Sequence, residues 1–279
     1  YGKVIPYGQE KGNEKTLQYT VQAPLGVVVA VIPFNFPSDL FCQKVPPALL
    51  MGNSVILKPS AHNPLTLTKY VEYLIEAGVP GGAINLINGN GGEAVQAMAE
   101  NPHVALVSLT GSTIAGAETM AKCAKNITHV MLELGGNDAF ILHKDGDLDL
   151  AVEETVWGRL YNTGQVCCAS KRFLVHKDVK EAFVEKLKER LSHIPVRMPS
   201  NPEATIGCLI SEDAAKKVES QVNETVSLGA KVVFGGRRKG AFYEPTILVD
   251  VTKSMPVAKD EEIFGPVISI IEYEDLDEA

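Results

Sequence analysis

Short apolar runs alternate with amphipathic segments along most of the chain. The apolar runs predict buried strands at residues 26–32, 54–58, 84–86 and 104–109. The amphipathic segments predict helices at about 40–51, 66–77 and 93–99. Because proline disrupts a helix interior, we expect the first helix to break or restart at Pro46-Pro47. The alternation indicates βαβ units and a parallel sheet covered by helices on both faces.

A second region with its own strands and helices begins near Gly135-Gly136. Its helices are expected at about 148–160, 180–191 and 213–228, and its strands at 173–175, 231–233, 246–248 and 267–271. The opening stretch 16–21 alternates polar and apolar residues as an exposed or edge strand does. The pattern therefore predicts a two-lobed α/β architecture with a junction near residue 135. An active site is expected in the cleft at the carboxyl ends of the strands.

Composition narrows the class of protein. The chain has 279 residues, 26 Lys+Arg against 34 Asp+Glu, and a net charge of −8, which argues against nucleic-acid binding. The one basic cluster, Arg237-Arg238-Lys239, fits a solvated loop. The apolar runs are too short to span a bilayer. Five cysteines without zinc-type spacing indicate no metal site and a reducing, cytoplasmic location.

Cys167 and Glu133 are the first candidates for chemistry. Cys167 lies in a loop of small residues between a helix and a strand, where neighbouring N–H groups could lower the pKa of a nucleophilic thiol. Glu133 ends an apolar strand, where desolvation would raise the pKa of its carboxyl toward the range of a general base. The alternatives are a buried structural thiol for Cys167 and a salt-bridged strand end for Glu133.

Two further segments follow predicted strands. Asn35 lies in the turn Pro33-Phe34-Asn35-Phe36-Pro37, where a fixed amide can donate to an oxyanion, although Asn is also an ordinary turn residue. Thr110-Gly111-Ser112-Thr113 opens a helix, and its N–H groups could bind a phosphate. A plain helix cap is the alternative there, because the segment matches neither a Walker A loop nor a G-x-G-x-x-G fingerprint.

In this order, the elements resemble the aldehyde dehydrogenase superfamily. The motifs that carry the resemblance are Pro33–Pro37, Lys58-Pro59-Ser60, Leu109–Ser112, Glu133–Asn137, Gly164–Cys167 and Glu261–Pro266. The cysteine loop looks most like the succinate-semialdehyde, benzaldehyde and lactaldehyde dehydrogenase branch. The resemblance implies partial oligomerisation strands at 1–23, a Rossmann-type dinucleotide-binding domain at 24–135, and an α/β catalytic domain at 136–279 that is incomplete at its C-terminus.

The resemblance also implies the roles of the catalytic residues. Cys167 would attack the aldehyde to give a thiohemiacetal, and the Asn35 amide with the Cys167 backbone N–H would hold its oxyanion. After oxidation to a thioester, Glu133 would activate the water that releases the acid. Glu133 favours hydrolysis over a CoA-acylating reaction, because the acylating branch lacks this carboxylate. A redox switch between Cys167 and Cys168 is disfavoured by the strain of such a ring.

For the cofactor, the resemblance implies NAD or NADP. Lys58 and Glu262 would hold ribose hydroxyls, Phe264 would pack by the nicotinamide ribose, and Gly91, Gly111 and Ser112 would lie along the adenosine and pyrophosphate. The remaining expected cofactor residues are Pro33, Phe34, Ser60, Ala61 and Leu134. Ala61 stands where NAD-preferring relatives place a Glu, so NADP should be accepted or preferred. His62 is expected to be a solvent-facing loop residue.

The resemblance defines the partners and the substrate less closely than the catalytic residues. The expected partners are a small aldehyde, such as succinate semialdehyde, and identical subunits in a homodimer or homotetramer. Arg172 could anchor an acid group, but an Arg at a strand start is more often structural. Two alternatives remain, namely a CoA-acylating dehydrogenase or acyltransferase and a silent protein that keeps the fold. Family members are longer, so we expect this chain to be a central portion of a longer protein.

Overall fold

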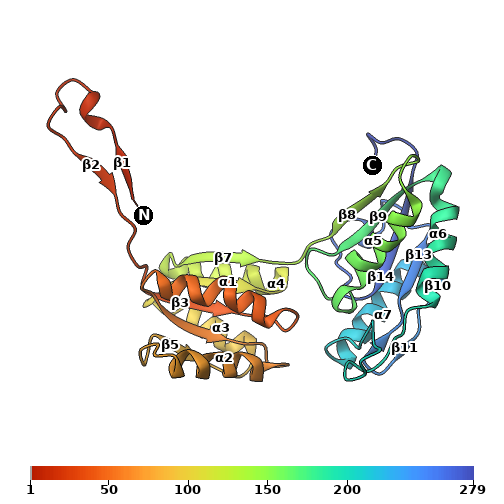
Figure 1. The fold of residues 1–279 in the computed structure, drawn as a ribbon, viewed down its shortest axis with the longest axis horizontal. Helices are drawn as coiled ribbons and strands as arrows, with labels where there is room; N and C mark the ends of the chain where they lie inside the picture. The colour runs from red at the N-terminus through yellow and green to blue at the C-terminus, as the bar shows by residue number, and fades with distance from the viewer. Residues whose placement is uncertain (1) are drawn as a thin grey trace. The chain divides into compact units, whose positions relative to one another are not determined.

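The computed structural model describes residues 2–279, which form two compact units. The first unit reaches Glu133, and the second comprises Leu134–Ala279 (Figure 1). Residue 1, part of the expected segment 1–23, lies outside the described residues. The rest of that segment holds an antiparallel hairpin of β1 (Lys3–Ile5) and β2 (Gln18–Thr20) whose strand residues are all exposed. The assignment of oligomerisation, cofactor and catalytic roles to these parts stays a prediction.

The first unit is built on a five-stranded parallel sheet, as predicted. Its strands are β3 (Val27–Val31), β4 (Ser54–Lys58), β5 (Ile84–Leu86), β6 (Val104–Thr110) and β7 (His129–Glu133). The spatial order is β5-β4-β3-β6-β7, with every neighbouring pair parallel. The strand order reverses direction between β3 and β6, and ligands of open α/β sheets bind at such a point.

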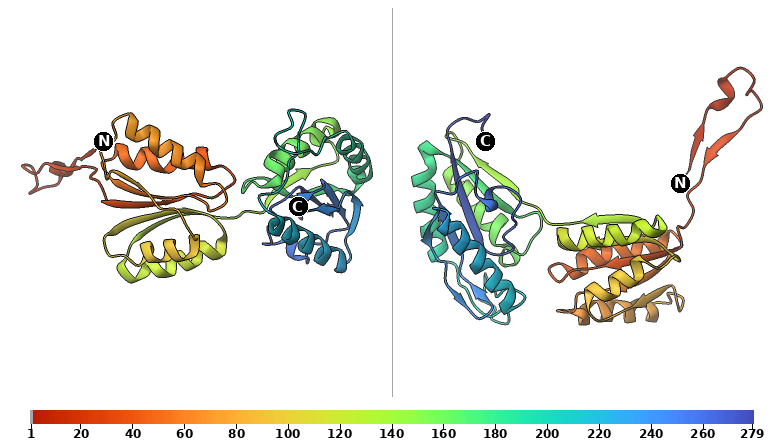
Figure 2. Two further views of the ribbon diagram at one scale, coloured as in Figure 1. Left: turned by 90° about the horizontal axis from the view of Figure 1, so that it is seen from below. Right: turned by 180° about the vertical axis from the view of Figure 1, so that it is seen from behind.

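Four helices cover this sheet. They are α1 (Pro37–Leu50), α2 (Pro64–Glu76), α3 (Gly91–Ala99) and α4 (Thr113–Cys123). Figure 2 shows α1 and α2 on one face of the sheet and α3 and α4 on the other. The α1–α2 face encloses a core that includes Ala30, Ile32, Val45, Leu57 and Leu67. The expected covering of both faces is therefore confirmed.

The expected break at Pro46-Pro47 is wrong, because α1 runs continuously through both prolines. Proline donates no backbone hydrogen bond, so the carbonyls of Cys42 and Gln43 lose their donors within the helix. Both residues are exposed, and water can hydrogen-bond to their carbonyls. Helix α1 therefore reaches Leu50, and the strand that follows begins at Ser54.

The second unit contains a mixed five-stranded sheet. Its strands are β8 (Asp138–Leu142), β9 (Ser170–His176), β10 (Lys231–Phe234), β13 (Thr246–Val249) and β14 (Val267–Tyr273), in the order β10-β13-β14-β9-β8. Only β10 pairs antiparallel within this sheet. A short hairpin of β11 (Arg238–Lys239) and β12 (Phe242–Tyr243) lies outside it.

Helices form two cores on the faces of this second sheet. Helices α5 (Leu148–Leu160) and α6 (Lys177–Ser192) bury one core with strand residues such as Ile247, Ile268 and Ile270. Helix α7 (Glu212–Ser227) buries the other with Leu248 and Val267. Neighbouring residues of β13 and β14 thus face different cores, as the pleat of a strand requires. Among the described residues, no helix is long and apolar enough to cross a membrane.

Candidate active site

A cavity of about 410 Å³ lies in the first unit at the carboxyl ends of β3, β4 and β6. It brings together seven of the expected cofactor residues, namely Pro33, Phe34, Lys58, Ser60, Ala61, Gly91 and Gly111. These residues come from three separate strand ends and from the start of α3. The cavity therefore lies at the point of the sheet where the strand order reverses, as expected for a nucleotide site.

Two helices begin at or beside this cavity. Asn90 caps α3 by accepting a hydrogen bond from Gly92 N at 3.1 Å, and Ser112 caps α4 by accepting one from Ala115 N at 3.2 Å. The Ser112 hydroxyl thus performs the capping role considered in the sequence. Gly91 would place a Cβ in open space, so the backbone there can approach a bound group closely. Helix N-termini of this kind favour phosphate oxygens.

Charged side chains in the cavity bear on the choice of cofactor. Lys58 ends β4 with only 2% exposure, and burial lowers the pKa of its ammonium group. Ala61 is exposed, and His62 is exposed as expected but also lines the cavity. Glu118 of α4 is a further lining residue. Position 61 has no carboxylate, but Glu118 supplies one to the lining of the same cavity.

Glu133 ends β7, where Thr110 of β6 is its partner in register. Thr110 Oγ1 donates a hydrogen bond to Glu133 Oε2 at 2.8 Å, and Lys44 Nζ lies 3.5 Å from the same oxygen. Lys44 also donates to Ser108 Oγ at 3.0 Å and is almost fully buried beneath α1. One carboxylate oxygen is thus fixed by a hydroxyl and an ammonium group.

The expected desolvation of Glu133 is wrong. Its side chain is 48% exposed, and Met131 of the same strand is 56% exposed. The reason is that β7 is an edge strand of the sheet and not a buried central one. The carboxylate is therefore open to solvent water while Thr110 and Lys44 hold it.

Asn35 lies in a turn directly after β3, as predicted, and is half-buried. Asn63 donates a hydrogen bond to the Phe34 carbonyl oxygen at 2.8 Å. The rings of Phe34 and His62 are packed edge to face, with 6.0 Å between their centroids. Tyr70 of α2 donates to Ser38 Oγ at 2.8 Å. These contacts fix both sides of the turn, which leaves the position of Asn35 well defined within the first unit.

The cysteine loop of the second unit begins with strained backbone. Asn162, Thr163 and Gly164 all have positive φ values, of 48°, 58° and 75°. Such strain costs about 1–3 kcal/mol per non-glycine residue and occurs at functional sites. Gln165 holds the end of the turn, since its Nε2 donates to Asn162 O at 3.0 Å and its Oε1 accepts from Ile210 N at 2.9 Å.

Cys167 is exposed, as is Cys168, and both are free thiols. Packing around the thiol raises the pKa of Cys167, and the neighbouring Cys168 side chain raises it further. The backbone N–H of Cys168 lowers this pKa, as expected of a neighbouring N–H group, and so does Lys171, but packing outweighs both and the expected net lowering is wrong. The alternative of a buried structural thiol is also excluded by the exposure of the residue.

The segment that precedes β14 packs against the cysteine loop within the same unit. A Cβ at Gly164 would lie 2.3 Å from Gly265 O, so the two backbones meet where only glycine fits. Arg159 is fully buried and donates to Val267 O at 2.6 Å and Ile263 O at 2.7 Å. Glu262 and Phe264 therefore lie in a segment fixed beside Cys167.

Both segments lie at the amino ends of parallel strands, since Cys167 precedes β9 and Phe264 precedes β14. The cavity of the first unit therefore lies at carboxyl ends, where the active site is expected, whereas Cys167 lies at the amino end of β9. Leu134, the other expected cofactor residue, begins the second unit. Arg172 Nε donates to Asn137 O at 2.6 Å, which supports its structural reading.

Glu262 supports the fit of a cofactor with hydroxyl groups. Its Oε1 atom is buried and forms an ion pair with Lys171 Nζ at 3.1 Å, and the described residues supply no further donor to this oxygen. A buried acceptor of this kind can take a hydroxyl from a ligand. Within the first unit, the lining of the cavity by itself fits a dinucleotide. Among the described residues, no cluster of His, Cys, Asp and Glu could hold a metal ion.

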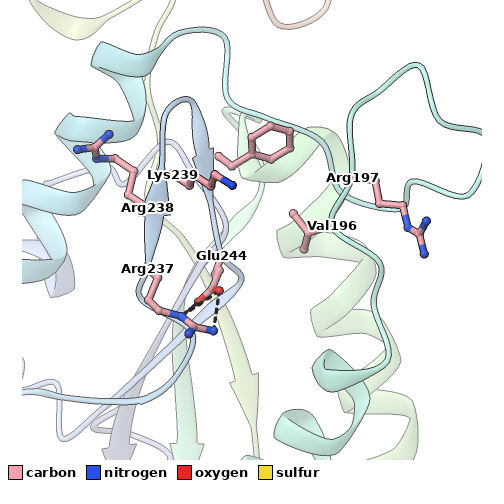
Figure 3. A pocket seen from close by; sticks show the side chains of 7 residues that line it. Val196, Arg197, Arg237, Arg238, Lys239 and Glu244 are labelled. Atoms are coloured by element: carbon pink, nitrogen blue, oxygen red, sulfur yellow. Dashed lines mark hydrogen bonds and ion pairs between the residues drawn. The ribbon is translucent and has the colours of Figure 1, made fainter.

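A second cavity, of about 620 Å³, has a basic lining in which the three arginines are each paired with a carboxylate. Figure 3 shows Arg237 turned onto Glu244, with an ion pair of 3.0 Å. Arg238 pairs with Glu219 of α7 at 2.8 Å, and Arg197 pairs with Glu203 at 3.2 Å. These arginines are neutralised by carboxylates, so the cluster is no free cationic site, but the expected loop is wrong for Arg238 and Lys239, which form the strand β11.

Sequence reasoning missed the charged residues that hold the site, namely Lys44, Glu118, Arg159 and Lys171. Lys44 and Arg159 lie inside helices, where a cation usually faces solvent. The available signal was their position on otherwise apolar helix faces, four residues after Leu40 and three after Val156.

Comparison with known proteins identifies the family to which the chain belongs. The model of the Aldehyde dehydrogenase family matches residues 1–279. The 3-sulfolactaldehyde dehydrogenase of Priestia megaterium is 40% identical over 279 residues, which are 100% of this chain and 58% of the relative. The succinate-semialdehyde dehydrogenase (NADP(+)) of Escherichia coli is 40% identical over 278 residues, 99% of this chain and 57% of the relative.

Solved structures of aldehyde dehydrogenases superpose closely on this chain. The succinate-semialdehyde dehydrogenase of Burkholderia pseudomallei superposes with a TM-score of 0.94 at 36% identity, covering 100% of this chain and 57% of that one. An NAD-dependent aldehyde dehydrogenase of Sinorhizobium meliloti has a TM-score of 0.94 at 35% identity, with 99% and 55% covered. The chain thus spans just over half the length of the relatives it matches.

Proposed function

Because the chain belongs to the aldehyde dehydrogenase family, we propose that the protein oxidises an aldehyde to the carboxylic acid with NAD or NADP. The single observation that carries the proposal furthest is the cavity at the carboxyl ends of β3, β4 and β6. Lys58, Gly91 and Gly111 line it, and α4 begins beside it. These features suit a dinucleotide.

The proposed chemistry begins at Cys167. Its thiolate adds to the aldehyde carbon, and the Asn35 amide and the Cys167 backbone N–H donate to the resulting oxyanion. Each such donor contributes about 3–4 kcal/mol in comparable sites. When bound, NAD(P) supplies the hydride acceptor that converts this adduct to a thioester. Lys58, Gly91, Gly111 and Ser112 would hold the cofactor.

The proposed second half of the reaction is hydrolysis at the thioester. Glu133 takes a proton from water, the hydroxide adds to the thioester carbon, and the C–S bond breaks to release the acid and the Cys167 thiolate. The exposed carboxylate held by Thr110 and Lys44 supports this role, because a general base needs both access to water and a fixed direction. A CoA-acylating reaction would make no use of this carboxylate.

We propose an aldehyde with an acid group, such as succinate semialdehyde, as the substrate. The names of two relatives support this choice, since succinate semialdehyde and 3-sulfolactaldehyde are both anionic. Betaine aldehyde dehydrogenase of Cereibacter sphaeroides, at 38% identity, bears a cationic substrate in its name and supplies the contrast. A homodimeric or homotetrameric state and a cytoplasmic location stay predictions.

The test is the absorbance of reduced nicotinamide in the purified full-length protein. Succinate semialdehyde, benzaldehyde, lactaldehyde and betaine aldehyde are each supplied with NAD and with NADP. Reduction that is fastest with succinate semialdehyde and absent in Cys167→Ala supports the proposal. Absence of reduction with every aldehyde contradicts it, and reduction that requires CoA indicates acyl transfer instead.

A further inference from the structure

Lys171 contacts the nucleophile's backbone and the Glu262 carboxylate at the same time. Its Nζ donates to Cys167 O at 2.6 Å and to Ala169 O at 3.2 Å, and lies 3.1 Å from Glu262 Oε1. We propose that Lys171 is a positioning residue that fixes Cys167 relative to the carboxylate that would hold the cofactor ribose. This inference rests on the proposed function and names a residue that controls the same site.

The burial of Lys171 is the first reason to assign it more than a packing role. Its side chain is 2% exposed, and burial lowers the pKa of the ammonium group while Glu262 opposes that shift. Backbone carbonyls alone could be satisfied by a neutral donor. A buried cation is stable only with a charged partner, and Glu262 supplies one. The charge of Lys171 therefore links the two loops in a way that a neutral side chain would not.

Other contacts already hold the two loops together. Arg159 donates to Ile263 O and Val267 O, and lies 3.5 Å from Gly164 O. The close approach of Gly164 to Gly265 is a second tie. Neither contact involves the Cys167 carbonyl, and Arg159 acts on the Glu262 carboxylate through charge alone, without a hydrogen bond to it. Changing Lys171 would therefore leave the loops packed and remove only the link between these two groups.

The electrostatic consequence gives the inference its sharpest readout. The Lys171 ammonium lowers the pKa of the Cys167 thiol, against the packing around the thiol that raises it. Glu262 neutralises part of that positive charge. Removing the Lys171 charge should therefore raise the thiol pKa, and removing the Glu262 charge should lower it. A merely structural role for Lys171 would not give shifts of opposite sign.

The experiment measures the iodoacetamide alkylation rate of Cys167 against pH, read by peptide mass, in the full-length protein without aldehyde or cofactor. In Lys171→Met the profile should move to higher pH by about one unit, the low end of the effect of a neighbouring charge. In Glu262→Gln it should move to lower pH. Lys171→Arg, which keeps the charge, should stay near wild type.

Lys180→Met is the matched control. Lys180 of α6 is 17% exposed and pairs with Glu272 of β14, so its loss removes a comparable ion pair far along the strand from Cys167. Its alkylation profile should equal that of the wild type. Unchanged profiles in both Lys171→Met and Glu262→Gln would overturn the inference. Should Lys171→Met fail to fold, an unchanged profile in Glu262→Gln alone would overturn it.

Turnover supplies the second readout. In Lys171→Met, kcat should fall by about 10-fold or more with little change in the KM for aldehyde, because small displacements of a nucleophile are costly to the rate. An unchanged kcat in folded Lys171→Met would contradict a positioning role. A wild-type protein that reduces neither cofactor would refute the proposed function, and the alkylation profiles would still decide whether Lys171 acts on Cys167.

Discussion

Lys44 Nζ on α1 lies 3.5 Å from Glu133 Oε2 at the end of β7, and Thr110 Oγ1 donates to the same oxygen. The lysine is 4% exposed in its side chain, whereas the glutamate is 48% exposed. A buried cation thus holds one oxygen of an exposed carboxylate from the protein side. This geometry suits a base that must take a proton from water.

Replacing Lys44 should slow the hydrolytic half of the reaction. In Lys44→Met the carboxylate loses its fixed direction, so we expect steady-state turnover to fall about 10-fold, a part of what a general base contributes. A burst of reduced cofactor followed by slow turnover would show that hydrolysis has become limiting. Lys69→Met, which removes an exposed ion pair with Glu72, is the control and should behave as wild type. Equal rates in both variants would refute the role of Lys44.

Gly164 should tolerate no side chain. Its φ is +75°, and a Cβ would lie 2.3 Å from Gly265 O, so Gly164→Ala should lower the free energy of unfolding by about 2–4 kcal/mol. Gly240 has a φ of +59° with nothing within 4 Å of its Cβ position. Gly240→Ala should therefore lose only about 1 kcal/mol. Denaturant unfolding compares the two, and equal losses would mean that the Gly164–Gly265 contact is unimportant.

The reactivity of Cys167 should require alkaline pH in the absence of cofactor. Packing and Cys168 raise the thiol pKa, so half-maximal alkylation should occur at a higher pH than for an ordinary cysteine thiol. Because the pKa is higher in the folded chain than in the unfolded one, the associated stability is present below the unfolded pKa. It is lost as the pH rises through the folded pKa. Half-maximal alkylation below the ordinary value would contradict the effect of burial.

Residues 61 and 118 should set the cofactor preference. A carboxylate in Ala61→Glu would repel a 2′-phosphate, so the kcat/KM ratio of NADP to NAD should fall by about 10-fold or more. Glu118 lines the same cavity, and Glu118→Gln should shift the ratio toward NADP. Glu118→Asp, which keeps the charge, is the control. Ratios that stay constant in all three variants would mean that these positions do not face the ribose phosphate.

Much of the fold was predictable because the sequence pattern is local. The strand Val27–Val31 is a continuous apolar run, and α2 ends where Gly78 follows it. Position within the sheet is not local information. The apolar Met131 makes β7 resemble a central strand in the sequence. In the structure β7 is an edge strand of the sheet, and Met131 is exposed. The continuity of α1 through Pro46 depends on which carbonyls face water, and that follows only from packing.

The candidate site also has residues that the sequence predicts and residues that only the structure reveals. Motifs identified Cys167, Glu133 and Asn35 as candidates, and the cavity brings together Lys58 and Gly111. The residues that orient them were not predicted, because their partners are distant in sequence. Lys44 meets Ser108 across 64 positions, and the contact arises from the packing of α1 on the sheet. The Cys167 pKa likewise depends on packing that no motif records.

The division of roles between Cys167 and Glu133 is tested most directly by the mass of Glu133→Gln after brief exposure to succinate semialdehyde and cofactor. We expect the protein to gain the mass of the acyl group on Cys167 and the adduct to persist, because oxidation proceeds while hydrolysis lacks its base. The wild type should release the acid and return to its original mass. A Glu133→Gln protein that turns over at the wild-type rate without an adduct, or carries the acyl group on another residue, would contradict the account.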